Sequence, residues 1–106
     1  MNRKEFINTL FDNGQGLTLD QIQTIDNYLS NSNPNIRDDI QELMKSNDNL
    51  DFESARQILI DQERQDFLDE MNSCSDLLKL KDFLTGYLPS NSKLSDMQVY
   101  RLSYLK

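Results

Sequence analysis

The chain of 106 residues contains no histidine, one cysteine, three glycines and two prolines. Without histidine, it lacks the commonest proton shuttle and metal ligand of proteins. The glycines are too scattered to form a phosphate-binding loop. Cys74 has no disulfide partner within the chain, which agrees with a reducing compartment, and its polar neighbours supply no base that would activate a thiolate. We therefore expect Cys74 at a helix boundary, without a catalytic role.

Long apolar runs are also missing. No segment approaches the roughly 18 apolar residues of a transmembrane helix, and no apolar stretch of signal-peptide length follows the basic residues near the start. A cytoplasmic protein without membrane association is thus the expectation. No segment alternates as a half-buried strand does. We expect a single helical domain over residues 1–106 that buries about two-thirds of its unfolded surface.

The sequence does contain a gapless threefold repeat, in residues 4–25, 37–58 and 81–102. Each copy begins with a basic and an acidic residue, continues with apolar residues, and returns after a polar gap to a leucine and a helix-capping residue. Such a unit is usually one supersecondary element that buries its apolar side against its neighbours. The leucine and capping pairs are Leu17 and Thr18, Leu50 and Asp51, and Leu94 and Ser95.

Each copy has the pattern of a helix, a short loop and a second helix. In the second copy, Ile36, Ile40, Leu43 and Met44 recur at the spacing of one helix face. The pattern predicts an all-α fold of about six helices, forming three hairpins packed as a compact bundle or a short helical array. The predicted helices span residues 3–12, 18–31, 34–46, 51–72, 75–88 and 95–105.

Local signals mark several helix starts. Thr18 with Gln21, and Ser95 with Gln98, fit the capping box, in which each side chain satisfies a free backbone amide of the other residue. Asp51 is expected to cap the second helix of the middle copy. The dipeptide at residues 33–34, asparagine then proline, predicts a cap at residue 33 and a first helical residue at 34.

The copies differ at two places, and both lie in the middle of the chain. Eleven extra residues follow Ile58 and lengthen the fourth helix into an acidic extension over residues 59–76. Asp39 occupies the position of Phe6 and Phe83 in the other copies, so its helix should bury a narrower apolar stripe. These departures mark the region where an interaction surface is expected.

The net charge of −7 is concentrated in the same region. Residues 38–76 contain 12 acidic and three basic residues, whereas residues 77–106 contain two acidic and five basic residues. A nucleic acid needs a basic footprint on its protein partner, so direct binding to DNA or RNA is disfavoured. A protein with a basic surface is the expected partner.

The sequence does not match the patterns of known calcium-binding, DNA-binding or metal-binding sites. The first copy is similar to the flanks of an EF-hand, but the loop is too short and Gln21 stands where the bidentate glutamate belongs. A DNA-reading helix-turn-helix lacks a basic recognition face. Asp66 and Glu70, at i and i+4, have the spacing of a metal-binding pair, yet the same spacing is common on solvated helix faces. We expect no catalytic, cofactor or metal site.

Aromatic residues leave one alternative open. Phe67 continues an apolar line down the acidic fourth helix with Ile60 and Met71. These side chains either form the core stripe or, if the extension projects, an apolar strip rimmed by acid, which is typical of a binding patch. Tyr100 and Tyr104 are spaced to form a second patch or an amphipathic edge of the last helix.

The leading hypothesis is a non-enzymatic protein that inhibits or neutralises a partner by covering a basic surface. Whether that surface binds nucleic acid, so that the carboxylates imitate phosphates, is left open by the sequence. In type the protein is similar to phage- or plasmid-encoded inhibitors, such as bacteriocin immunity proteins and anti-CRISPR proteins. The alternative is an adaptor or regulatory subunit that uses an apolar helix face, with self-association through the repeats open. The expected partner-binding residues are Asp61, Glu63, Asp66, Asp69, Glu70, Asp38, Asp39, Glu42 and Phe67.

Overall fold

The computed structural model of the protein describes residues 2–11, 16–89 and 94–103. Within these ranges the chain forms six α-helices and no strand, which confirms the all-α fold. The helices are α1 (Arg3–Phe11), α2 (Leu19–Ser30), α3 (Ile36–Ser46), α4 (Phe52–Ser73), α5 (Leu77–Thr85) and α6 (Asp96–Leu102).

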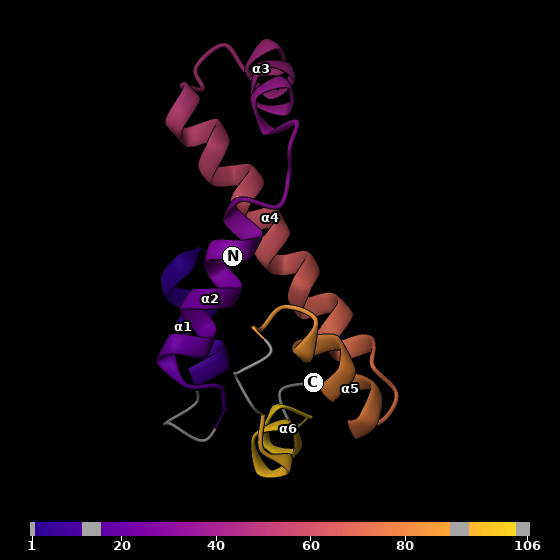
Figure 1. The fold of residues 1–106 in the computed structure, drawn as a ribbon. Coiled ribbons are helices and arrows are strands. Elements are labelled where there is room, and N and C mark those ends of the chain that lie inside the picture. Colours follow the sequence, from indigo (N-terminus) through magenta and orange to yellow (C-terminus); the bar gives the residue numbers. More distant parts are fainter. Residues whose placement is uncertain (1, 12–15, 90–93, 104–106) are drawn as a thin grey trace.

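Helix α4 organises the molecule. It has 22 residues, which corresponds to a length of about 33 Å, and it runs through a molecule of 47 × 25 × 25 Å. Its first half packs on α3, and further along it contacts α2 and α5 (Figure 1). Helix α1 packs on α2, and α5 packs on α6. These contacts are consistent with the predicted pairing of helices into three hairpins.

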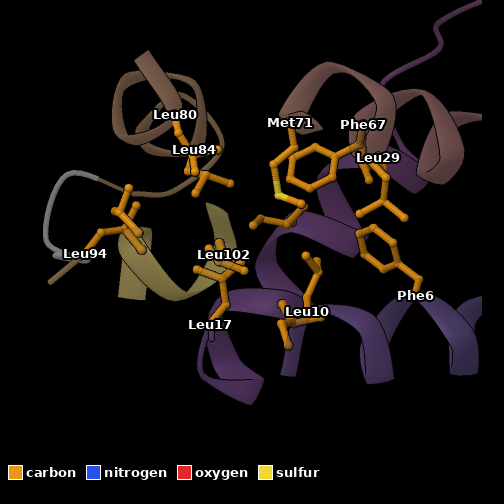
Figure 2. Packing of buried hydrophobic residues seen from close by; sticks show 14 residues of the cluster. Phe6, Leu10, Leu17, Leu29, Phe67, Met71, Leu80, Leu84, Leu94 and Leu102 are labelled. Carbon is orange, nitrogen blue, oxygen red and sulfur yellow. The ribbon is translucent and has the colours of Figure 1, made fainter. Parts of the chain in front are cut away.

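The hydrophobic core lies at the end of the molecule that contains α1, α2, α5, α6 and the second half of α4 (Figure 2). Phe67 of α4 is at its centre and contacts the rings of Phe6, Phe83 and Tyr87, with ring centroids 5.0–5.9 Å apart. The contacts with Phe6 and Tyr87 are edge-to-face, and such contacts stabilise a core beyond the area that they bury. The core therefore joins both terminal hairpins through the second half of α4.

Helix α3 and the first part of α4 lie outside this core. We call residues 36–60 the arm, which forms the other end of the molecule (Figure 1). Its buried apolar side chains are Ile40, Ala55 and Ile60, and none of them belongs to the main cluster. Only Ile40 of α3 is buried, and Asp39 is exposed, which confirms the narrow apolar stripe predicted for this helix.

The predicted caps are present at three helix starts. Thr18 with Gln21 and Ser95 with Gln98 form complete capping boxes at α2 and α6. The two boxes also touch, because the Gln98 amide Nε2 donates to Gln21 Oε1 at 3.0 Å. Asp51 accepts from the Ser54 backbone amide at 2.7 Å and caps α4. Equivalent positions of the first and third repeats are thereby linked by a hydrogen bond.

Glycine is required where α1 approaches the start of α2. The Leu17 amide donates to the Leu10 carbonyl at 3.1 Å, and the chain turns at Gly16 immediately before this contact. A Cβ atom at Gly16 would overlap the Leu10 carbonyl oxygen. Any larger residue would therefore push the first hairpin apart.

Two helices differ from the predictions in their bounds. Helix α3 begins at Ile36 rather than at residue 34, because Asn33 accepts the Asn35 amide at 2.9 Å and forms a turn instead of a cap. Helix α5 covers Leu77–Thr85 rather than 75–88, since Asp76 caps its start and two further turns follow its last residue. Cys74 is the C-cap residue of α4, which confirms its predicted place at a helix boundary. The predicted helix ends at residues 12 and 105 lie outside the described residues.

Candidate partner-binding surface

Helix α4 carries five of the predicted partner-binding carboxylates. Asp66, Asp69 and Glu70 are exposed, and Asp61 and Glu63 are half-buried. Glu63, Asp66 and Glu70 follow one another at i, i+3 and i+7 and so share one side of the helix. Burial raises the pKa of Tyr87, and the negative charges of Glu70 and Glu63 raise it further. The electrostatic field of these carboxylates therefore reaches Tyr87, which packs against the core.

Helix α3 supplies the other three carboxylates, Asp38, Asp39 and Glu42, all of which are exposed. Asp39 is held in place by Asn33, whose amide Nδ2 donates to Asp39 Oδ2 at 2.7 Å. Within the described part of the chain, none of the ion pairs involves these three residues or Glu63, Asp66, Asp69 and Glu70 of α4. Seven of the predicted acidic residues therefore present negative charge that no ion pair among the described residues compensates.

Phe67 is buried, whereas its inclusion among the predicted partner-binding residues required an exposed side chain. Its side chain is 2% exposed and packs among the aromatic rings of the core. The extension does not project, because its apolar stripe faces α1, α2 and α5. Phe67 therefore belongs to the core, and the acidic face of α4 has no aromatic strip along it.

A buried ionic network joins α2 to α4, and the sequence analysis did not predict it. Arg64 is 4% exposed and Asp26 is 3% exposed. Arg64 donates from Nε to Asp26 Oδ1 at 2.7 Å and from Nη1 to Asp61 Oδ1 at 2.5 Å. The exposed Arg3 of α1 is 3.3 Å from Asp26 Oδ2. Asp61 is therefore occupied within the molecule and is the least available of the predicted binding residues.

The electrostatics of Arg64 reflect this network. Burial alone lowers the pKa of Arg64, but the hydrogen bonds and negative charges of Asp26 and Asp61 outweigh burial and raise it. A buried guanidinium is tolerated only when its donors are paired in this way. The network fixes α4 against α2 and so sets the position of the acidic side of α4.

A signal for this network is present in the sequence. Arg64 lies between Ile60 and Phe67 at helical spacing, inside the apolar stripe of α4. Asp26 occupies a similar place on α2, between Ile22 and Leu29. Two opposite charges, each inside the apolar stripe of its own helix, indicate a buried pair, because an unpaired charge there would be too costly.

Exposed apolar side chains also border a cavity between α5 and α6. A cavity of about 320 Å³ there is lined by Leu77, Leu78, Lys81, Asp96 and Val99. Leu78 is 69% exposed, and Lys81 pairs with Asp96 across the cavity at 3.2 Å. Tyr100 of α6 is also exposed, whereas Tyr104 lies outside the described residues. Helices α5 and α6 therefore offer one apolar face beside a cavity.

The described residues contain neither a metal-binding cluster nor a membrane-spanning helix. None of their cysteine and carboxylate side chains gather in a group of three or more that could hold a metal ion. No helix among them has the length and apolar character needed to cross a membrane.

No protein-family model, curated protein or solved structure matches the chain. Its function is therefore inferred from the charge and geometry of this surface.

Proposed function

We propose that this protein is a small, non-enzymatic binding protein that inhibits or neutralises a partner by covering a basic surface. In this proposal, three helix hairpins form a short array whose arm and acidic α4 side dock on the partner. The basic surface is one that would otherwise bind nucleic acid. The protein then acts by occupancy alone, without a cofactor.

One observation supports this function above the others. Seven carboxylates on α3 and α4 are exposed or half-buried, and none takes part in an ion pair among the described residues. Concentrating like charge on neighbouring helices destabilises a fold through self-repulsion. A basic partner would relieve that repulsion, and the field would accelerate the encounter of the two proteins.

The second candidate is an adaptor or regulatory subunit that binds through an apolar face. The cavity between α5 and α6 favours it, because Leu77 and Leu78 are exposed beside it. In this case the acidity would mainly keep the protein soluble. The two functions differ in the surface that they use and in their response to salt.

Affinity capture from the native host at low salt, followed by quantitative binding of the captured protein, tests the proposal. We expect the affinity to fall steeply as salt rises, because exposed charges are screened beyond about 8 Å at physiological ionic strength. A variant with Asp38→Asn, Glu42→Gln and Glu70→Gln should bind about tenfold more weakly, since three exposed pairs contribute about 0.5 kcal/mol each.

Leu78→Ser, beside the cavity between α5 and α6, is the control. It should leave the affinity and its salt dependence unchanged. Loss of binding in Leu78→Ser, together with normal binding in the charge-neutralised variant, would contradict the inhibitor function and support the adaptor.

A further inference from the structure

A small groove lies where α2, α3 and α4 meet. Its volume is about 150 Å³, well below the roughly 300–1,000 Å³ of pockets that hold a drug-sized ligand. It is therefore too small for a cofactor and has the size of a site for one side chain. Leu29 of α2, Ile36 of α3, and Leu59 and Ile60 of α4 provide its aliphatic lining.

Aliphatic and anionic side chains line the groove together with the neutral polar Asn33 and Gln62. Leu29 and Ile60 are buried, and Ile36 and Leu59 are half-buried. The same groove is lined by Asp39, Glu63 and Asp66, of which Asp39 and Asp66 are exposed and Glu63 is half-buried. The exposed carboxylates therefore lie outward of the aliphatic side chains, and they come from two helices.

We propose that this three-helix groove receives one arginine side chain from the basic surface of the partner. The inference rests on the proposed function and names the contact that gives it specificity. The aliphatic stem of arginine would pack on the aliphatic side chains of the groove, and the guanidinium would donate to its carboxylates.

Charge complementarity selects this occupant. Three carboxylates face one small volume, and no ion pair among the described residues compensates Asp39, Glu63 or Asp66. A neutral side chain would leave this repulsion in place, and an anion would increase it. Arginine is favoured over lysine because its planar fork offers five donors in different directions, which suits carboxylates from separate helices.

The groove is also pre-arranged. The Asn33 amide holds Asp39 Oδ2 at 2.7 Å, and Glu63 is only one residue from Arg64, which the buried network fixes against α2. Little conformational freedom would then be lost when the guanidinium binds. The buried network that fixes α4 against α2 thus also positions the carboxylates of α4 that would bind the arginine.

Titration of the labelled protein with N-acetyl-argininamide, followed by amide NMR, tests the groove. The expected result is a saturable shift confined to residues near 33–39 and 59–66. N-acetyl-citrullinamide, which has nearly the same shape without charge, should not shift these amide signals. N-acetyl-lysinamide should bind about threefold or more weakly because it lacks the planar fork.

Two double variants, each of which removes two carboxylates, show which carboxylates bind the guanidinium. Glu63→Gln with Asp66→Asn should weaken the argininamide response by about tenfold. Asp38→Asn with Asp69→Asn removes the same charge away from the groove and should change it by less than about twofold. Equal loss in both variants, or shifts spread over the whole acidic surface, would overturn the groove as the arginine site.

An octa-arginine peptide separates failure of the groove from failure of the proposed function. If the peptide binds with strong salt dependence but argininamide does not bind in the groove, the groove inference is wrong and the function stands. If octa-arginine does not bind even at low salt, both are overturned.

Discussion

Arg64 shows how a single residue can be placed against its usual preference. Arginine is rarely fully buried unless it is paired, and here it lies within the apolar stripe of α4. Asp26 and Asp61 accept its donors from two directions. Such a network adds little net stability, because desolvation of the charges offsets much of their attraction, but it penalises any other register of α4 on α2.

Removing Arg64 alone should therefore lower the free energy of unfolding more than replacing both Arg64 and Asp26. Arg64→Ala leaves Asp26 buried, with the exposed Arg3 as its remaining ion-pair partner among the described residues, and we expect the free energy of unfolding to fall by about 3–5 kcal/mol. The double variant Asp26→Leu with Arg64→Met replaces the pair by apolar side chains and should recover most of that loss. Urea denaturation followed by circular dichroism measures both.

The exposed pair of Lys81 and Asp96 is the matched control. Lys81→Met should change the stability by less than about 1 kcal/mol, as is usual for surface ion pairs. A double variant as unstable as Arg64→Ala would show that the network stabilises the fold directly. The raised pKa of Arg64 implies that its contribution is complete at all pH values below the ordinary arginine range and is lost only as pH rises above it.

At the scale of single elements, the caps decide where the helices begin. Thr18, Asp51, Asp76 and Ser95 each accept a backbone amide three residues on. These bonds satisfy amides that have no partner within their own helix. Because the bond is made within one turn, its presence depends little on the rest of the molecule.

Asp51 gives the caps a measurable pH dependence. The backbone and side-chain hydrogen bonds from Ser54 lower the pKa of Asp51, despite a small opposing effect of burial. A lowered pKa means that its stabilisation is present above the ordinary value of about 3.9 and is lost as pH falls through the lowered pKa. Asp51→Asn keeps a capping side chain without the charge, so its thermal midpoint should fall less than that of the wild type between pH 5 and 2.

Asp48→Asn provides the comparison for this experiment, because it removes the same charge from the turn before α4. It should retain the pH dependence of the wild type. If both variants lost it equally, the total charge of the region rather than the cap of α4 would be responsible.

At the scale of the whole molecule, stability is unevenly distributed. The main core joins α1, α2, α5, α6 and the second half of α4, whereas the arm depends on Ile40, Ala55 and Ile60. Regions with few buried apolar contacts open at lower free energy than the core. The proposed partner-binding carboxylates of α3 are thus on the part of the molecule with fewer buried apolar contacts.

Hydrogen exchange should reveal this difference directly. We expect the amides of α3 to exchange faster than those of α2 and the second half of α4. Ile40→Ala should speed exchange in the arm alone, because Ile40 is outside the main cluster. Leu84→Ala removes a fully buried side chain of the core and should destabilise the whole protein by about 2–5 kcal/mol. Uniform exchange across both parts would contradict a separate arm.

Much of the fold could be predicted because its signals are local. The apolar spacing indicated six helices, and the capping residues placed the starts of α2, α4 and α6 correctly. The start of α3 was wrong because Asn33 has two local options, a cap or a turn, and the chain uses the turn. Whether the three repeats are copies of one hairpin stays a prediction.

The candidate site was harder to predict because exposure is not a local property. Asp38, Glu42 and Asp66 are as exposed as their charge suggested. Phe67 is in the core, and Asp61 pairs with Arg64, because the packing of α2 and α5 on α4 decided which side of α4 is covered. The three-helix groove arises only where segments distant in the sequence meet.

The sequence by itself determined the helical segments, three of their capped starts and the strongly acidic middle of the chain, since each depends on residues within a few positions of one another. Only the tertiary structure decided that Asp26 meets Arg64, that Phe67 is buried and that carboxylates of α3 and α4 border one groove. Those features depend on how helices pack over distances of tens of residues, and that packing is settled by the burial of the whole apolar surface at once.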